Sequence, residues 1–255
     1  MKKCLFIATL FFSWLFAADD MEVDDNVVIF MQSTPISSDV NVEPINNYID
    51  SLDINDDESI VEIGFLKHFY QLKNLRLDFC CNITDNIAPI FQLSNLRALS
   101  IRGIGLTNTK PLAQLTYLDA LDIGGNPINT FCHISKLVQL KYLSVNRLFK
   151  VSNREPLQKL VNLIYLDMEC MFIDYVDKET GKEWGNKYQS LKWISKLVKL
   201  KTFIGNGNNL FKPRDFEFVF NLPSIERIEC GGWEYLCPVT QTQIRNHPTL
   251  KHLKI

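Results

Sequence analysis

The sequence predicts an α/β solenoid, a horseshoe with a concave parallel β-sheet and short helical or irregular segments on its convex side. Two observations carry this prediction: leucines recur in phase every 22 residues, and another apolar side chain follows each of them two residues later. Alternate residues of a strand share one face, so each repeat is expected to supply one strand to a common core. At 255 residues and 46% hydrophobic, the chain is large enough to bury such a core.

Residues 1–17 have the pattern of a secretory signal peptide. Lys2 and Lys3 precede an apolar run from position 4 to position 16, and Ala17 provides a small residue at its exit. The run is shorter than the roughly 20 residues that a membrane-spanning helix needs. We therefore expect cleavage near Ala17, a secreted, cell-surface or periplasmic location, and no membrane span in the mature chain. Loss of both lysines changes the formal net charge from −2 to −4.

Residues 18–44 combine two acidic clusters, a short apolar run, and serines and prolines. We expect a flexible N-terminus that leads to a cap, because an end repeat otherwise exposes its apolar face to water. The repeats then occupy residues 45–255.

The clearest repeats lie within residues 66–173. Their strand leucines are assigned as Leu77, Leu99, Leu121, Leu143 and Leu166. The next interior positions are Phe79, Ile101, Ile123, Val145 and Met168. Weaker repeats have Leu52 as an early strand residue, and Phe203, Ile228 and Leu253 as late ones, at spacings of 25 residues.

An asparagine follows the strand leucine by five residues in two repeats, at Asn82 and Asn126. We expect both amides to lie inside and to bond backbone groups where the chain leaves the strand. On this assignment the glycosylation sequon at Asn82 is inaccessible. Ile104, Leu148 and Met171 interrupt the asparagine ladder in other repeats.

Three proline steps complete the pattern, and each lies four residues before the next leucine triplet: Pro89-Ile90, Pro111-Leu112 and Pro156-Leu157. With the leucines above, they resemble the leucine-rich-repeat family, in particular the bacterial internalin-like class with 22-residue repeats. The resemblance implies that the proline segments form the convex side. It also implies a non-enzymatic recognition module that binds a protein on its concave face.

One spacing is longer, because Phe203 follows Leu166 by 37 residues. We assign the excess to a loop inserted at residues 174–190. Its aromatic residues Tyr175, Trp184 and Tyr188 allow two interpretations: they grip a ligand, or they pack the loop onto the convex side.

Side chains beside the strand leucines are expected to line the concave face. The residues directly after the leucines form a column that we expect to be acidic and largely solvated: Asp78, Ser100, Asp122, Ser144 and Asp167. The predicted partner-binding residues are Arg102, Asp122, Tyr142, Asn146, Tyr165, Asp167 and Glu169. Their centre is the tyrosine pair, since tyrosine is frequent at binding hot spots. The alternative is that these tyrosines are ordinary strand residues.

Several functional classes find no support in the sequence. A net charge of −2 disfavours nucleic-acid binding. The four histidines show no metal-ligand or catalytic spacing, so we predict no enzyme activity, no metal and no cofactor. The six cysteines that follow Cys4 match no disulfide framework, and we expect mostly unpaired thiols.

Two functions from different classes remain. In the first, an exported module binds a protein partner, with interaction with a host as an analogy from the fold. In the second, the protein has a structural role and self-associates through the C-terminal edge of its sheet.

Overall fold

The computed structural model describes residues 49–57, 60–83, 87–151, 153–171, 190–207, 213–230 and 237–254, and the backbone of three short strands outside these ranges. The predicted signal peptide lies outside the described residues. So do most of the predicted N-terminal cap and most of the insertion at 174–190.

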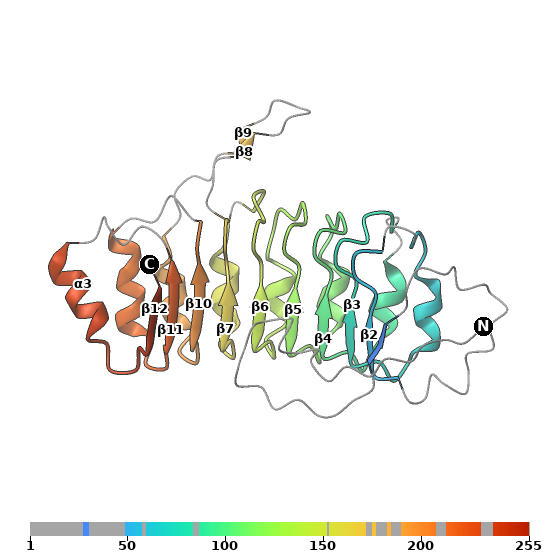
Figure 1. Ribbon diagram of the computed structural model, residues 1–255, viewed down its shortest axis with the longest axis horizontal. Coiled ribbons are helices and arrows are strands. Elements are labelled where there is room, and N and C mark those ends of the chain that lie inside the picture. Colours follow the sequence, from blue (N-terminus) through green and yellow to red (C-terminus); the bar gives the residue numbers. More distant parts are fainter. Residues whose placement is uncertain are drawn as a thin grey trace.

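A single curved layer of parallel strands forms one side of the molecule (Figure 1). Its strands follow the chain order: β1 (Val28–Phe30), β2 (Ser51–Asp53), β3 (Asn74–Arg76), β4 (Ala98–Ser100), β5 (Ala120–Asp122), β6 (Tyr142–Ser144), β7 (Tyr165–Asp167), β10 (Thr202–Gly205), β11 (Arg227–Cys230) and β12 (His252–Lys254). Within the insertion, β8 (Tyr175–Val176) pairs antiparallel with β9 (Glu183–Trp184).

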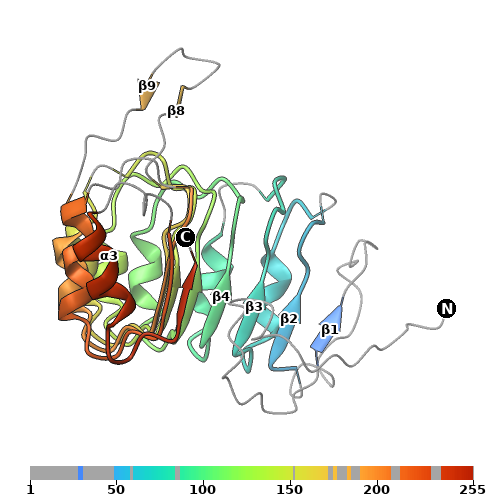
Figure 2. The same cartoon turned by 60° about the vertical axis from the view of Figure 1, so that its left-hand side comes forward.

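Short helices form the opposite side, so each repeat is one strand followed by one return segment (Figure 2). They are the 3₁₀ helices η1 (Gly64–His68), η2 (Ala88–Gln92), η3 (Pro111–Gln114), η4 (Ile134–Lys136), η5 (Glu155–Lys159), η6 (Lys192–Lys196) and η7 (Pro213–Asn221), and the helix α3 (Pro238–Arg245). Pro89, Pro111 and Pro156 lie in the first turns of η2, η3 and η5, where a missing N–H costs no hydrogen bond. The predicted α/β solenoid with irregular convex segments is confirmed.

The core lies between the two layers and runs without interruption along the solenoid. One residue at the centre of each strand faces inward and pairs in register with the same position of the next strand: Leu52, Leu75, Leu99, Leu121, Leu143, Leu166, Phe203, Ile228 and Leu253. From Leu52 to Ile228 these central residues are buried. The early strand at Leu52 and the late strands at Phe203, Ile228 and Leu253 are therefore confirmed.

The register corrects our assignment of one repeat. Leu75 pairs with Leu99, so the strand leucine of that repeat is Leu75 and not Leu77. Leu77 takes the second interior position, as Ile101 does in the next repeat, and both are fully buried. All positions that we counted from Leu77 therefore move by two residues.

A left-handed residue four positions after the central residue confirms the corrected phase. Every repeat from β2 to β10 has a positive φ there, at Asp56, Phe79, Gly103, Gly125, Arg147, Cys170 and Gly207. This conformation turns the chain away from the sheet at the same point of each coil. Glycine adopts this left-handed backbone conformation without strain, whereas residues with a Cβ rarely adopt it.

Asn126 has the interior role that we predicted for it. Its amide nitrogen donates to the carbonyl oxygens of Ile101 and Ile123, each at 2.8 Å, and its amide oxygen accepts from the N–H of Leu106 at 2.9 Å. The prediction for Asn82 was wrong, because Asn82 is exposed. Cys80 occupies the asparagine position of that repeat, and its thiol donates to the carbonyl of Ile54 at 3.0 Å.

We predict that Asn126→Ala destabilises the solenoid by about 3 kcal/mol or more, because each buried backbone group left without a partner costs roughly 1–3 kcal/mol. Equilibrium unfolding in urea measures the change. Asn108→Ala is the control: this exposed asparagine accepts one bond, from the N–H of Lys110, and its loss should cost less than about 1 kcal/mol. Equal losses in the two variants would contradict the ladder role of Asn126.

Candidate functional site

The concave face carries two rows of side chains that flank the central residues. The preceding row consists of the residues directly before them, namely Ser51, Asn74, Ala98, Ala120, Tyr142, Tyr165, Thr202, Arg227 and His252. The following row consists of the residues directly after them, namely Asp53, Arg76, Ser100, Asp122, Ser144, Asp167, Ile204, Glu229 and Lys254. Asp78 belongs to neither row, since it lies three residues beyond Leu75.

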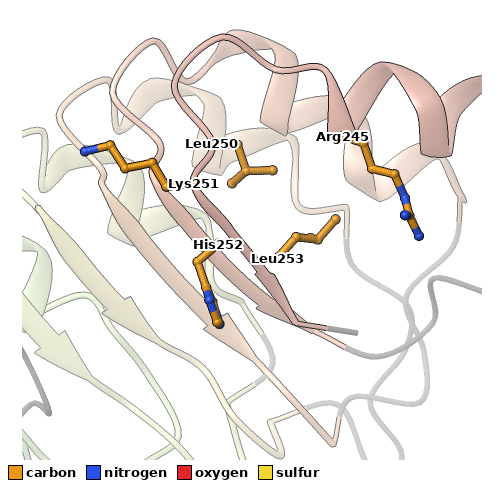
Figure 3. Close-up of a pocket in the computed structure, with 5 residues that line it drawn as sticks. All are labelled: Arg245, Leu250, Lys251, His252 and Leu253. Atoms are coloured by element: carbon orange, nitrogen blue, oxygen red, sulfur yellow. The ribbon is translucent and has the colours of Figure 1, made fainter.

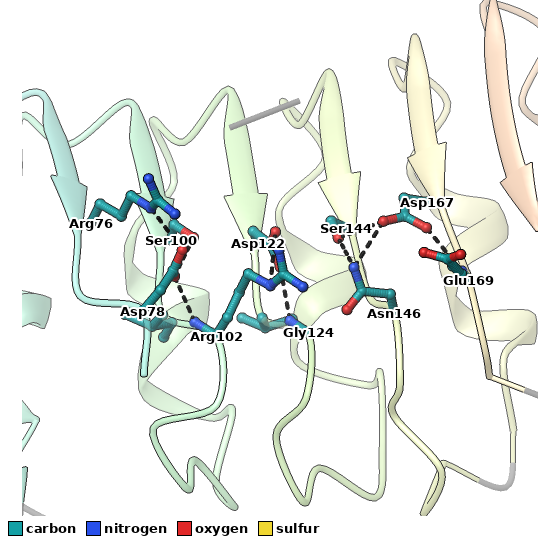
Figure 4. Close-up of polar contacts among 12 residues, drawn as sticks. Arg76, Asp78, Ser100, Arg102, Asp122, Gly124, Ser144, Asn146, Asp167 and Glu169 are labelled. Atoms are coloured by element: carbon teal, nitrogen blue, oxygen red, sulfur yellow. Dashed lines mark hydrogen bonds and ion pairs between the residues drawn. The ribbon is translucent and has the colours of Figure 1, made fainter. Parts of the chain in front are cut away.

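The acidic column is buried, and our expectation of a largely solvated column was wrong. Asp122 is 2% exposed and Asp167 is 9% exposed, while Ser100 and Ser144 are buried beside them. Buried carboxylates require partners, because removing a charge from water is costly. The partners lie on the same and neighbouring strands (Figure 4).

The first cluster is centred on Asp78. One carboxylate oxygen accepts from the hydroxyl of Ser100 at 2.5 Å and from the backbone N–H of Arg102 at 2.9 Å. The other accepts from Nε of Arg76 at 2.8 Å, and Arg76 also forms an ion pair with Asp53 at 3.6 Å. These contacts tie together three successive repeats.

The second cluster is centred on Asp122. Its carboxylate accepts from the backbone N–H of Gly124 at 2.9 Å and lies 3.7 Å from Nε of Arg102. Burial is the main influence on this carboxyl, and it raises the pKa of Asp122 to about 7, although Arg102 and Gly124 act in the opposite direction.

The third cluster is centred on Asp167. One carboxylate oxygen accepts from the hydroxyl of Ser144 at 3.0 Å and from the amide of Asn146 at 2.9 Å. The other accepts from the backbone N–H of Glu169 at 2.8 Å. Asp167 therefore fixes both its own turn and the neighbouring strand.

Tyr142 and Tyr165 lie side by side in the preceding row, with ring centroids 6.5 Å apart and planes tilted by 36°. They pack against Ala98 and Ala120, which are fully buried. Both tyrosines are half-buried, and desolvation raises the pKa of Tyr165. They form a pre-organised aromatic patch, since packing limits their rotamers before any ligand arrives.

The seven predicted site residues thus fall into three neighbouring groups. Arg102 pairs with Asp122; Asn146, Asp167 and Glu169 form one cluster; and the two tyrosines form the aromatic patch. Sequence reasoning assigned no role to Gly124, yet a Cβ at this position would overlap the amide oxygen of Asn146. The sequence did contain a signal for this role: Gly124 and Asn146 both lie three residues after the central residue of neighbouring repeats, so the glycine leaves room for the asparagine side chain.

Other kinds of site receive little support from the described residues. Within them, no group of three or more His, Cys, Asp or Glu side chains is arranged to hold a metal ion. The six cysteines that they include carry free thiols. None of the helices in this part of the chain has the length and apolar character that crossing a bilayer requires.

Solved structures with the same fold include two internalins and another leucine-rich-repeat protein. An internalin C2 from Listeria monocytogenes superposes with a TM-score of 0.61 and 19% identity, over 83% of this chain and 83% of that one. An internalin (InlF) from the same species has a TM-score of 0.58 and 16% identity, over 84% of this chain and 64% of that one. A leucine-rich-repeat protein of Leptospira interrogans has a TM-score of 0.52 and 20% identity, over 81% and 46% of the two chains.

No protein-family model matches the sequence, and the search of curated proteins finds no match. At these identities the structural likeness shows the fold. The chain has the leucine-rich-repeat fold of the internalins, as its leucine and proline spacing predicted.

We predict that Asp122→Asn stabilises the protein more at pH 8 than at pH 5. The pKa of Asp122 is raised from 3.8 to about 7 in the folded state, so folded protein keeps the proton between these values while unfolded chain loses it. Wild-type stability therefore falls as the pH rises from about 4 to about 7, by on the order of 4 kcal/mol from this group. Asparagine has no charge to bury at either pH.

Thermal unfolding of both proteins at pH 5 and pH 8 measures this difference. A gap between variant and wild type that is the same at both pH values would show that Asp122 is already ionised at pH 5.

Proposed function

We propose that this leucine-rich-repeat solenoid is an exported, non-enzymatic recognition module that binds a protein partner on its concave face. The observation that carries the proposal is the aromatic patch of Tyr142 and Tyr165, held on the face by Ala98 and Ala120. Large aromatic side chains already ordered in the free protein gain contact area at a small entropic cost, which is the property of interface hot spots.

The polar residues around the patch support the same role. Arg102 and Glu169 are partly exposed, so their charged groups are available to a ligand. Asp122, Asn146 and Asp167 are buried, and we assign them the task of holding the surface in shape. An interface centre with anchored aromatics and a polar rim is typical of protein recognition.

Export and a role outside the cell are part of the proposal. The pattern of residues 1–17 supports export. The internalin-like fold supports recognition of another protein, and we extend the proposal to a protein of a host. Both inferences come from the fold, since no curated sequence relative matches.

Self-assembly through the C-terminal edge is the weaker candidate. A hollow of about 310 Å³ lies beside β12, and its lining includes the partly buried Leu250 and Leu253 (Figure 3). However, Lys251, His252 and Lys254 are all exposed on this edge. Pairing two such edges would bring lysines together, and lysine on an edge strand opposes strand pairing. The charges therefore favour recognition over assembly.

We predict that the double variant Tyr142→Ala, Tyr165→Ala loses at least about 2 kcal/mol of partner affinity, roughly 30-fold, as expected for hot-spot residues. The mature chain, carrying a photo-crosslinking amino acid at Thr202, which pairs in register with Tyr165, captures the partner from extracts of candidate target cells. Affinity for the purified partner is then measured by calorimetry for wild type and variant.

Tyr117→Ala is the matched control. Tyr117 is 58% exposed, follows η3, and is not part of the cluster that Tyr142 and Tyr165 form with Ala98 and Ala120, so its loss should leave affinity unchanged. Retention of full affinity by the double variant, with its fold intact by circular dichroism, would remove the aromatic patch from the interface.

A further inference from the structure

A groove lies at the edge of the concave face, where strands β4, β5 and β6 pass into their turns. Its volume is about 420 Å³, and its lining comes from four successive repeats. Among the residues that line it are Phe79, Arg102, Gly124, Asn146 and Arg147.

Glycines explain why the groove exists. Gly124 and Gly125 form the turn of the β5 repeat. The position of Gly124 is occupied by Arg102 in the repeat before it and by Asn146 in the repeat after it, and the position of Gly125 is occupied by Arg147 in the repeat after it. The β5 repeat therefore lacks the side chains that its neighbours carry at these two positions. Figure 4 shows Arg102 and Asn146 on either side of Gly124. The floor is thus backbone, and side chains of the flanking repeats form the walls.

The groove is cationic, although the chain as a whole has a net charge of −2. Arg102, Arg147 and Lys150 line it, and the lining includes no carboxylate. The Arg102 guanidinium is already held in place, because it lies 5.7 Å from the centre of the Phe79 ring and 3.7 Å from Asp122. Arg147 is exposed at the end of β6. Two arginines converging on one hollow suit a carboxylate, which accepts from guanidinium groups in paired geometry.

Asn146 adds a second requirement. Its nitrogen donates to Asp167 and to Ser144, which directs its amide oxygen over Gly124. This oxygen is buried and has no hydrogen-bond partner among the described residues, in a side chain that is only 6% exposed. A buried acceptor of this kind is costly unless a donor reaches it. The occupant of the groove therefore needs an N–H or O–H group beside its anionic group.

We infer that this groove binds an acidic segment of the protein partner, with a Glu or Asp carboxylate between Arg102 and Arg147 and a backbone N–H on the amide oxygen of Asn146. The inference rests on the proposed function, because the partner on the concave face is what brings the segment to the groove. A peptide is favoured over an acidic glycan since Arg102 and Asn146 belong both to the groove and to the face beside the aromatic patch. A protein that covers the patch thus reaches the groove without a separate ligand.

The test uses two blocked peptides, acetyl-Gly-Glu-Phe-Glu-Gly-amide and the same peptide with glutamine in place of glutamate. Each is titrated into ¹⁵N-labelled mature protein, and amide shifts of Gly103 and Gly125 report on the groove. We expect the glutamate peptide to bind, to weaken as salt is raised, and to shift these amides, whereas the glutamine peptide does not.

Arg147→Gly removes one wall charge without endangering the fold. Arg147 has a φ of 55°, and glycine occupies the same position in the repeats of Gly103, Gly125 and Gly207. We expect about a tenfold loss of affinity for the glutamate peptide, as for one charge-assisted contact. Cys170→Gly makes the same backbone change one repeat further on, outside the groove, and Lys136→Ala removes an exposed cation from η4. Both should bind as the wild type does.

Equal binding of the two peptides, no binding of either, or full affinity in Arg147→Gly would overturn the inference. Sialyllactose is titrated in parallel. If this sugar shifts the amides of Gly103 and Gly125 while neither peptide binds, the occupant of the groove is an acidic glycan and not an acidic peptide. If the peptide fails while Tyr142→Ala, Tyr165→Ala still loses the captured partner, the groove inference falls and the proposed function stands. If the peptide binds and the tyrosine variant keeps its partner, the groove inference stands, and the aromatic patch loses its place in the proposed function.

Discussion

In-register stacking of one central apolar residue per coil is the constraint on which the rest of the structure depends. A coil of this protein has a single strand of three or four residues and a short return segment, so it cannot enclose a core alone. Leu99, Leu121 and Leu143 are buried because the neighbouring coils present the same position at the same height. The left-handed turn four residues later keeps that height constant, since it ends each strand at the same point.

The same register aligns the polar side chains and explains why the concave face is ordered before any ligand binds. Asp78 bonds a hydroxyl and a backbone N–H of the next strand, and Asp167 bonds Ser144 and Asn146 of the previous one. Each of these bonds joins two coils, so the clusters oppose sliding or opening of the sheet. Buried polar networks of this kind are stabilising only when their groups are satisfied. The amide oxygen of Asn146 is the exception among the described residues of the Asp167 cluster.

The sequence predicted the architecture because leucine spacing and proline steps report directly on burial and on the convex turns. It misled us at Leu77, since Leu75 and Leu77 are both leucine and only the second fits a spacing of 22; the repeat is in fact longer by two residues. Two local signals support Leu75: Cys80 fits the asparagine position, and Phe79 takes the left-handed turn in spite of its side chain. Burial of Asp122 and Asp167 could not be predicted from alternation alone. A strand pattern assigns these side chains to a face, while the density of cross-strand partners on that face decides whether water reaches them.

Burial of the carboxylates also changes what the concave face can recognise. Asp78 and the acidic residues of the following row bond serines, the backbone N–H of Gly124 and arginines of the protein itself, so they are poor sites for a ligand's cations. The groups that remain accessible are the cations paired with these carboxylates, such as Arg102, together with Arg147 and the two tyrosine rings. A chain with a negative net charge therefore presents a cationic edge beside an aromatic patch, and its overall charge does not describe this face. The local sign of charge is set by which member of each pair stays exposed to water.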